Sequence, residues 1–218
     1  MRVCVCCLTL LILAGQQSSI CQQTTGEHTA PAAKPGDAAA SATEPLSDED
    51  KANLLSEQVG KLMVKCVNLL TAQDPLSLDY CKQQRDLADQ YPPHLRLVDK
   101  MMAHDEYGIA LAAFDHKEEA LAEFDREITL VPKAVKPGAT EWSTAYWHRA
   151  MIYSQLGQTD KADHDYRVAE DNFRKPGYAT GDATAEKKRR TILRQHAALL
   201  QKEGKTDAAH RLLEEAVK

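Results

Sequence analysis

Aromatic residues are scarce in this sequence of 218 residues: Phe, Trp and Tyr make up 6% of it, although 43% is hydrophobic. Much of the hydrophobic content is Ala and Leu, which favour helices. After residue 47 no stretch alternates β-branched and polar residues as a half-buried strand does, whereas apolar residues recur at helical spacing. The sequence therefore predicts an all-α fold.

An excess of positive charge is also absent. The chain has 27 Lys and Arg residues against 32 Asp and Glu residues, which gives a formal net charge of -5. A general nucleic-acid binder needs a basic surface to contact phosphates. We therefore expect no nucleic-acid partner.

Motifs of common catalytic and metal sites are missing after residue 21. That part has no His-Glu-x-x-His and no Cys-x-x-Cys. Histidines do stand beside carboxylates, as in HDEYG at 104–108, but adjacent side chains of a helix point apart and make poor pairs of metal ligands. Gly204-Lys205-Thr206 resembles the end of a phosphate-binding loop, but Leu199 stands where that loop needs a glycine, and the preceding run is helical. We expect a protein that is not an enzyme and has no metal or cofactor.

The only long apolar run begins the chain. Arg2 precedes an apolar run from Val3 to Ala14, and small and polar residues follow, which is the layout of a secretory signal peptide over 1–21. The run is short for a bilayer span, which takes about 20 apolar residues, although an uncleaved anchor is the alternative. Gln16 stands where a bacterial lipoprotein has its lipidated cysteine. We expect an exported protein, periplasmic or extracellular, that meets a membrane only through an uncleaved leader or a partner.

Large apolar side chains are almost absent from the next segment, 22–46, which is rich in Ala, Thr, Pro and Gly. Such a segment buries too little surface to offset the entropy of ordering it. We predict a flexible linker there, and a helical domain over 47–218 that begins at the capping box of Ser47 and Asp50.

Four of the six cysteines lie in or beside the leader, which leaves Cys66 and Cys81. Their midpoint falls at 73–74, inside TAQDPLS, where we expect Asp74-Pro75 to turn the chain between two helices. Facing residues of an antiparallel helical hairpin have this relationship. In an oxidising compartment the pair is a disulfide candidate, and the alternative is two small buried residues at a helix interface.

Proline and glycine divide the rest of the chain into eight predicted helices, which form four pairs. The predicted helices cover 48–72, 78–90, 95–114, 117–131, 141–156, 159–173, 184–203 and 206–217.

The last two pairs contain the same pattern. GQTDKA at 157–162 returns as GKTDAA at 204–209, and a third copy aligns on Ala120, with Pro132 closing its second helix and Glu127 where the others have alanine. Small residues on both helices let the backbones approach, and larger residues fill the flanking space. A left-handed glycine ends the first helix, and Thr159 or Thr206 caps the next. The residues with shared offsets are Gly108, Leu111, Ala120, Phe124, Ala150, Tyr153, Ala162, Tyr166, Ala169, Ala197, Leu200, Ala209, Leu213 and Ala216.

This spacing resembles the tetratricopeptide repeat. The resemblance is strong over 143–173 and 190–217, good over 101–132 and weak over 62–93, where Leu69 is large for its place. It implies a superhelical stack of about four antiparallel hairpins, at 48–90, 95–131, 141–173 and 184–217. A generic Ala-rich bundle would explain the helices but not the shared offsets.

In the resembled family, the first helices of the hairpins line a groove that holds a partner peptide. Trp147 and Met151 lie one turn apart and could form its apolar anchor, unless Trp147 is ordinary core. Arg194 and Lys202 could receive acidic groups, and the basic run at 186–190 is either a solvated face or a contact for anionic lipid or an acidic partner. The resemblance places in the groove Met102, Asp105, Ile109, Thr144, Trp147, Met151, Gln155, Arg194, Ala198, Gln201 and Lys202, with Met63 and Leu70 if the first hairpin is in register.

We therefore expect an exported, non-catalytic module that binds a protein or peptide in this groove. The alternative is a structural subunit or assembly factor of a cell-envelope complex that acts through its outer surface.

Overall fold

A computed structural model describes residues 45–179 and 181–217 of the chain. The expected signal peptide, 1–21, and all but two residues of the expected linker, 22–46, lie outside the described residues. The part from Ser47 onward forms one compact unit. Its described residues form eight α-helices and no strand, as the hydrophobic pattern predicts.

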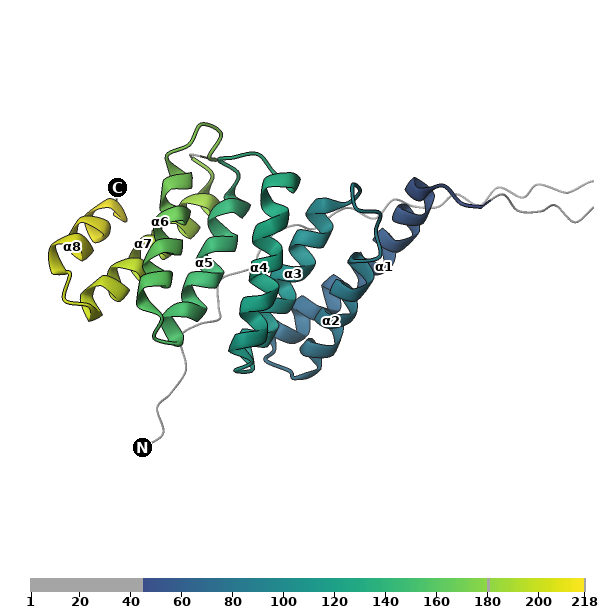
Figure 1. The fold of residues 1–218 in the computed structure, drawn as a ribbon, viewed down its shortest axis with the longest axis horizontal. Helices are drawn as coiled ribbons and strands as arrows, with labels where there is room; N and C mark the ends of the chain where they lie inside the picture. The colour runs from purple at the N-terminus through teal and green to yellow at the C-terminus, as the bar shows by residue number, and fades with distance from the viewer. Residues whose placement is uncertain (1–44, 180, 218) are drawn as a thin grey trace, which may run out of the picture. The chain divides into compact units, whose positions relative to one another are not determined.

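The helices form four antiparallel hairpins that follow one another along the chain (Figure 1). The packing within each hairpin is the most extensive in the molecule. In chain order the elements are α1 (Asp48–Thr71), α2 (Leu76–Ala88), α3 (Leu97–Ala113), α4 (Lys117–Ala134), α5 (Thr140–Gln155), α6 (Thr159–Phe173), α7 (Ala183–Lys202) and α8 (Thr206–Glu215).

The hairpins stack in a regular way. The second helix of each hairpin packs on the first helix of the next, as in α2 on α3, α4 on α5 and α6 on α7. The backbones of the first helices also approach one another in the order α1, α3, α5, α7. The second helices lie farther apart, and α2 reaches α4 through a side-chain bond from Arg85 Nη1 to Glu123 Oε1 at 2.9 Å. The first helices therefore lie on the inner side of the stack, as in a tetratricopeptide-like α-solenoid.

Small residues separate the two helices of a hairpin at the expected offsets. Gly108 of α3 lies directly against the ring of Phe124 in α4. The alanines that share these offsets are buried, as are Leu111, Tyr166 and Leu200, while Tyr153 and Leu213 are half-buried. The buried alanines are Ala120, Ala150, Ala162, Ala169, Ala197, Ala209 and Ala216.

The turns inside the last two hairpins need glycine. Gly157 has φ 72° and Gly204 has φ 75°, in the left-handed region that glycine adopts at little cost. Asp115 has φ 68° at the same place in the second hairpin. The prediction that Thr159 and Thr206 cap α6 and α8 is wrong, because Gln158 and Lys205 have the non-helical N-cap conformation and each threonine is already the first helical residue.

The sequence pattern predicted that Pro132 ends α4, the second helix of its hairpin, and that prediction is wrong. The helix continues to Ala134, and the N–H of Val135 still donates to the carbonyl of Val131 at 3.0 Å. Proline removes one hydrogen bond from a helix, but its fixed φ is helical, so a last turn can follow it.

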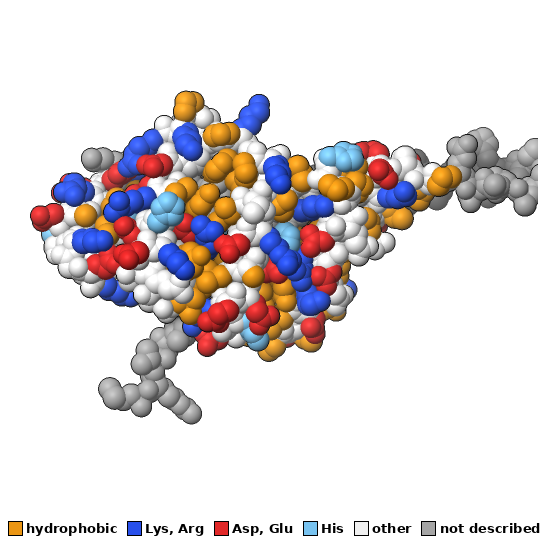
Figure 2. Space-filling model, viewed as in Figure 1, with side chains coloured by type: hydrophobic (Ala, Val, Ile, Leu, Met, Phe, Trp, Pro, Cys, Tyr) orange, Lys and Arg blue, Asp and Glu red, His pale blue; other side chains and the backbone are white. Residues whose placement is uncertain are grey.

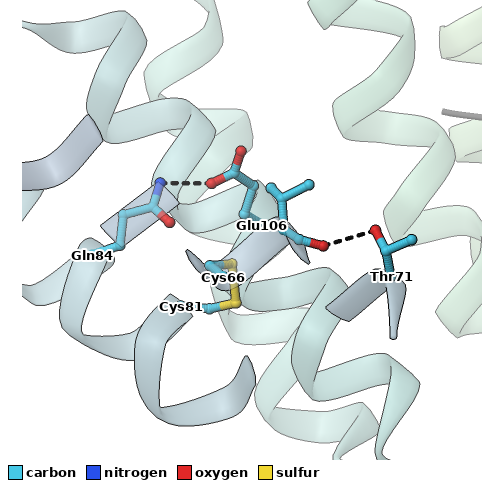
Figure 3. Close-up of a disulfide and its surroundings, with 6 residues drawn as sticks. Cys66, Thr71, Cys81, Gln84 and Glu106 are labelled. Atoms are coloured by element: carbon cyan, nitrogen blue, oxygen red, sulfur yellow. Dashed lines mark hydrogen bonds between the residues drawn. A yellow bond between two sulfur atoms is a disulfide. The ribbon is translucent and has the colours of Figure 1, made fainter. Parts of the chain in front are cut away.

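A disulfide joins α1 to α2 in the first hairpin (Figure 3). Cys66 and Cys81 are fully buried, and their Cα atoms lie 4.9 Å apart. Of the two alternatives for this pair, the structure contains the covalent one. Since Leu69 occupies the place of a small residue, the disulfide holds this hairpin where the others use close backbone contact.

Next to the disulfide, buried Gln84 and half-buried Glu106 tie α2 to α3. Gln84 Nε2 donates to Glu106 Oε2 at 2.6 Å (Figure 3). Burial raises the pKa of Glu106 to about 7, although the bond from Gln84 opposes the shift. The first two hairpins are therefore joined by a carboxyl group that titrates near neutral pH.

Candidate functional site

The inner helices present aligned side chains along the stack. On α3, Val98, Met102, Asp105 and Ile109 follow one another at helical spacing, so they lie on one stripe. Val98 and Met102 are each 40% exposed, although large hydrophobic side chains are normally buried. This stripe therefore offers apolar surface to solvent on the inner side.

A polar cluster interrupts this apolar surface where α3, α4, α5 and α7 meet. His148 Nδ1 lies 2.5 Å from Asp105 Oδ1, which links α5 to α3. Lys188 Nζ donates to Thr144 Oγ1 at 2.7 Å, which links α7 to α5. The two contacts connect three successive hairpins through polar side chains.

Glu127 of α4 completes the cluster. Its side chain is only 2% exposed, and its Oε2 atom has no hydrogen-bond partner among the described residues. Burial raises the pKa of Glu127 well above its usual value, Asp105 adds to the shift, and Lys188 opposes it. The charges of Asp105 and Lys188 therefore both act on a carboxyl group that lacks a partner.

Trp147 belongs to both the groove and the core. Its side chain is half-buried and packs against the core of the last two hairpins. The indole Nε1 donates to Gln195 Oε1 at 2.6 Å, and the ring centroid lies 4.8 Å from that of His148. Trp147 thus joins α5 to α7 and also borders the polar cluster.

The remaining groove predictions fall into three groups. Thr144 was expected to be open to a partner, but it is buried and donates to the carbonyl of Thr140, because α7 covers this end of α5. The half-buried residues are Asp105, Ile109 and Met151. The exposed residues are Met102, Gln155, Arg194, Ala198, Gln201 and Lys202.

On α7, sequence reasoning missed the residues that meet α5. Lys188 and Gln195 make these contacts, and with Lys202 they are spaced seven residues apart on one stripe. The run at 186–190 was expected to be a solvated face or a partner contact, yet Lys188 and Arg189 are half-buried and make internal hydrogen bonds. The seven-residue spacing is the signal that could have identified this stripe.

Buried histidines also meet carboxylates at the other hairpin junctions. His104 of α3 lies 3.2 Å from Asp89, which caps α2, and 2.6 Å from Glu123 in its own hairpin. His196 of α7 lies 2.6 Å from Glu170 and 2.8 Å from Asp163, both on α6. Each junction between hairpins therefore contains an imidazole and at least one carboxylate.

His196 is the clearest of these groups electrostatically. Burial alone would lower the pKa of its imidazole, but the bonds to Glu170 and Asp163 outweigh burial and raise it. Its ring also stacks on Tyr166, with centroids 5.1 Å apart. The pair of carboxylates therefore stabilises the protonated form of His196.

Charge on the surface is mixed in sign. Figure 2 shows Lys and Arg side chains interspersed with Asp and Glu over the face in view, with hydrophobic side chains between them.

Within 45–179 and 181–217, no group of three His, Cys, Asp or Glu side chains could hold a metal ion. None of the helices in these ranges has the length and apolar character of a membrane span.

Comparison with known proteins gives several similar solved structures. No family model and no curated protein matches the sequence. BtubC (BKLC) from P. vanneervenii is 14% identical, with a TM-score of 0.49 over 79% of this chain and 73% of that one. The MamA RS-1 ArsTM double mutant is also 14% identical, with a TM-score of 0.34 over 78% of this chain and 95% of that one. Neither likeness bears on function, which we argue from the site alone.

Proposed function

We propose that this chain is an exported, non-catalytic interaction module that binds a partner protein or peptide along the inner face of α3, α5 and α7. The observation that carries the proposal is the exposure of Val98 and Met102, 40% each, on the inner stripe of α3. Apolar side chains gathered on the concave side of a helical stack form a surface suited to protein binding.

The residues around this pair favour a protein as the ligand. Met102 and Met151 are flexible and polarisable, so they can adapt to different side chains. Trp147 contributes a large ring of the kind that dominates binding energy at interfaces. Asp105 and Lys188 supply charges of both signs beside these apolar groups, which is typical of a protein interface with a polar rim.

Two features support export. The N-terminal sequence has the layout of a secretory leader. The Cys66–Cys81 disulfide fits an oxidising compartment, because cytosolic thiols are kept reduced. Intact mass measurement of the protein from its native cells tests this point: we expect the mass without 1–21 and with two hydrogens fewer than the reduced chain, whereas a full-length reduced chain would contradict export.

The inner face is tested by matched substitutions. We would express the tagged full chain in its native cells, cross-link, and quantify captured proteins by mass spectrometry. Met102→Asp places a charge on the inner stripe, and Leu76→Asp places the same charge on an outer helix at a residue that is 54% exposed. Both variants should keep their helical circular dichroism, because both sites are exposed.

We expect Met102→Asp to lose the partner that wild type and Leu76→Asp retain. Equal capture by all three proteins would contradict binding at the inner face. Loss of the partner in Leu76→Asp alone would instead favour the outer surface, and with it a structural role in an envelope complex.

A further inference from the structure

The polar cluster on the inner face has an unsatisfied carboxyl group. Glu127 is buried, its Oε2 atom has no hydrogen-bond partner among the described side chains, and Asp105 and Lys188 are close enough to act on it electrostatically. Buried polar atoms in folded proteins are almost always hydrogen-bonded. An unpaired one therefore needs a reason.

The repeat pattern makes this group more unusual. Glu127 stands where the third and fourth hairpins have Ala169 and Ala216, both buried and both small enough for close helix packing. The other hairpins thus have a small residue at this offset, and alanine is the residue that their pattern predicts at position 127. A residue that breaks the local rule and costs stability is expected at a functional position.

The charges of the cluster define what it lacks. When both carboxyl groups are ionised, Asp105 and Glu127 carry two negative charges and Lys188 one positive charge. His148 holds Asp105 in place, and Lys188 is already bonded to Thr144. His148 and Lys188 thus bond to Asp105 and Thr144, and Glu127 is left without a cation that donates a hydrogen bond to its Oε2 atom.

We propose that Glu127 and Asp105 receive the cationic head of a Lys or Arg side chain from the partner that binds the inner face. This inference rests on the proposed function. The side chain of Asp105 is 20% exposed, so the cluster opens to the inner face at that residue. Met102 and Trp147 lie beside the opening and suit the aliphatic stem of a basic side chain.

An organic cation suits this site better than a metal ion. A metal ion in a protein usually has three or more protein ligands, and the described residues contain no such group of His, Cys, Asp and Glu. An ammonium or guanidinium group has several N–H donors and can bond two carboxylates at once.

Two synthetic peptide pools provide the probe. Both are five-residue peptides with blocked ends and flanks mixed from Ala, Leu, Met, Ser and Gln. One pool has Lys at the centre, and the other has norleucine, which keeps the aliphatic chain without the ammonium group. Each pool is passed over the immobilised full chain, and retained peptides are quantified by mass spectrometry.

We expect wild type to retain the Lys pool on the order of ten-fold better than the norleucine pool, as one charged hydrogen bond would give. Glu127→Gln should bring this ratio close to one. Glu118→Gln, an exposed residue of the same helix, is the matched control and should keep the wild-type ratio. Retention of the Lys pool by wild type should also rise with pH, since Glu127 must lose its proton to bind a cation.

Equal retention of both pools by wild type, or an unchanged ratio in Glu127→Gln, would overturn the inference. The proposed function would still stand if Met102→Asp abolished capture of the native partner. Loss of that difference between Met102→Asp and Leu76→Asp would instead overturn the proposed function itself, so the two failures are distinguishable.

Discussion

Gly108 of α3 lies so close to Phe124 of α4 that any side chain at position 108 would force the ring to shift. A Cβ atom on Gly108 would lie 2.6 Å from Cε1 of Phe124 and 2.9 Å from its Cδ1 and Cζ atoms. Phe124 is almost fully buried, so its ring has no free space to move into. This contact sets the distance between the two helices of the second hairpin.

Gly108→Ala should therefore destabilise the protein, although alanine is the better helix former. The helix propensity of Ala favours the variant by about 1 kcal/mol, but overpacking a filled core costs roughly 1–3 kcal/mol. We expect a net loss of up to about 2 kcal/mol in the free energy of unfolding, measured by urea denaturation.

Gly60→Ala is the matched control. Gly60 is also in the interior of a helix, α1, but no atom lies within 4 Å of the position its Cβ would take. Only the propensity effect remains there, so we expect a gain of about 0.5–1 kcal/mol. A gain of the same size from Gly108→Ala would show that the contact with Phe124 is not tight.

The helical hairpins could be predicted because their signals are local. Gly108, Ala120 and Phe124 act within one hairpin, and the turn glycines act through their own φ angles. These effects repeat at fixed offsets along the chain, so comparison of the copies was enough to find them. The same comparison identified Glu127 as a departure, although not its burial or its lack of a partner.

The polar contacts between hairpins could not be predicted in the same way. His104 meets Asp89 across 15 residues, His196 meets Glu170 across 26, and His148 meets Asp105 across 43. Such pairs depend on how far one hairpin rotates against the next, which no local pattern specifies. The sequence also did not decide whether Trp147 lies in the groove or in the core, because its hydrogen-bond partner Gln195 lies on another hairpin.

Reduction of the Cys66–Cys81 disulfide should loosen the first hairpin selectively. The cysteines are separated by 15 residues, and a cross-link of this length contributes about 3 kcal/mol in the chain-entropy account. In a repeat stack each hairpin contacts only its neighbours, so the effect should stay local. We expect faster amide hydrogen exchange in α1 and α2 after reduction, with exchange in α7 and α8 unchanged.

The control is the double variant Cys66→Ala, Cys81→Ala, whose amide exchange should not respond to reductant. Equally faster exchange along the whole described chain of the wild type would contradict a local effect.

The junction at His196 should make stability depend on pH. The pKa of its imidazole is raised above 6.5 in the folded protein, so the stabilisation is fully present below about pH 6.5 and is lost as pH rises through the folded pKa. His196→Gln should therefore cost more at pH 6 than at pH 9, by about 1.5–3 kcal/mol for the charged hydrogen bonds. Urea denaturation of both proteins at the two pH values measures this difference. An equal cost at both values would mean that His196 acts only through its shape.

Glu127 should also make stability fall as pH rises, because its burial favours the neutral form. Its pKa is raised in the folded protein, so the folded state holds a proton that the unfolded state releases above about pH 4.5. Stability therefore falls as pH rises from there, with a slope of up to about 1.4 kcal/mol per pH unit for one proton. Gln keeps the shape of the side chain and does not titrate, so Glu127→Gln should match wild type near pH 4.5 and exceed its stability increasingly toward pH 8.

Glu118→Gln provides the baseline for this comparison, since residue 118 is exposed on the same helix and should change stability little at any pH. Urea denaturation at several pH values measures all three proteins. A variant that is more stable than wild type and yet loses its preference for Lys peptides would show that Glu127 is kept for binding at the expense of the fold. If Glu127→Gln instead lowered stability at every pH, the carboxylate would have a structural partner, and Lys188, whose charge acts on it, would be the candidate.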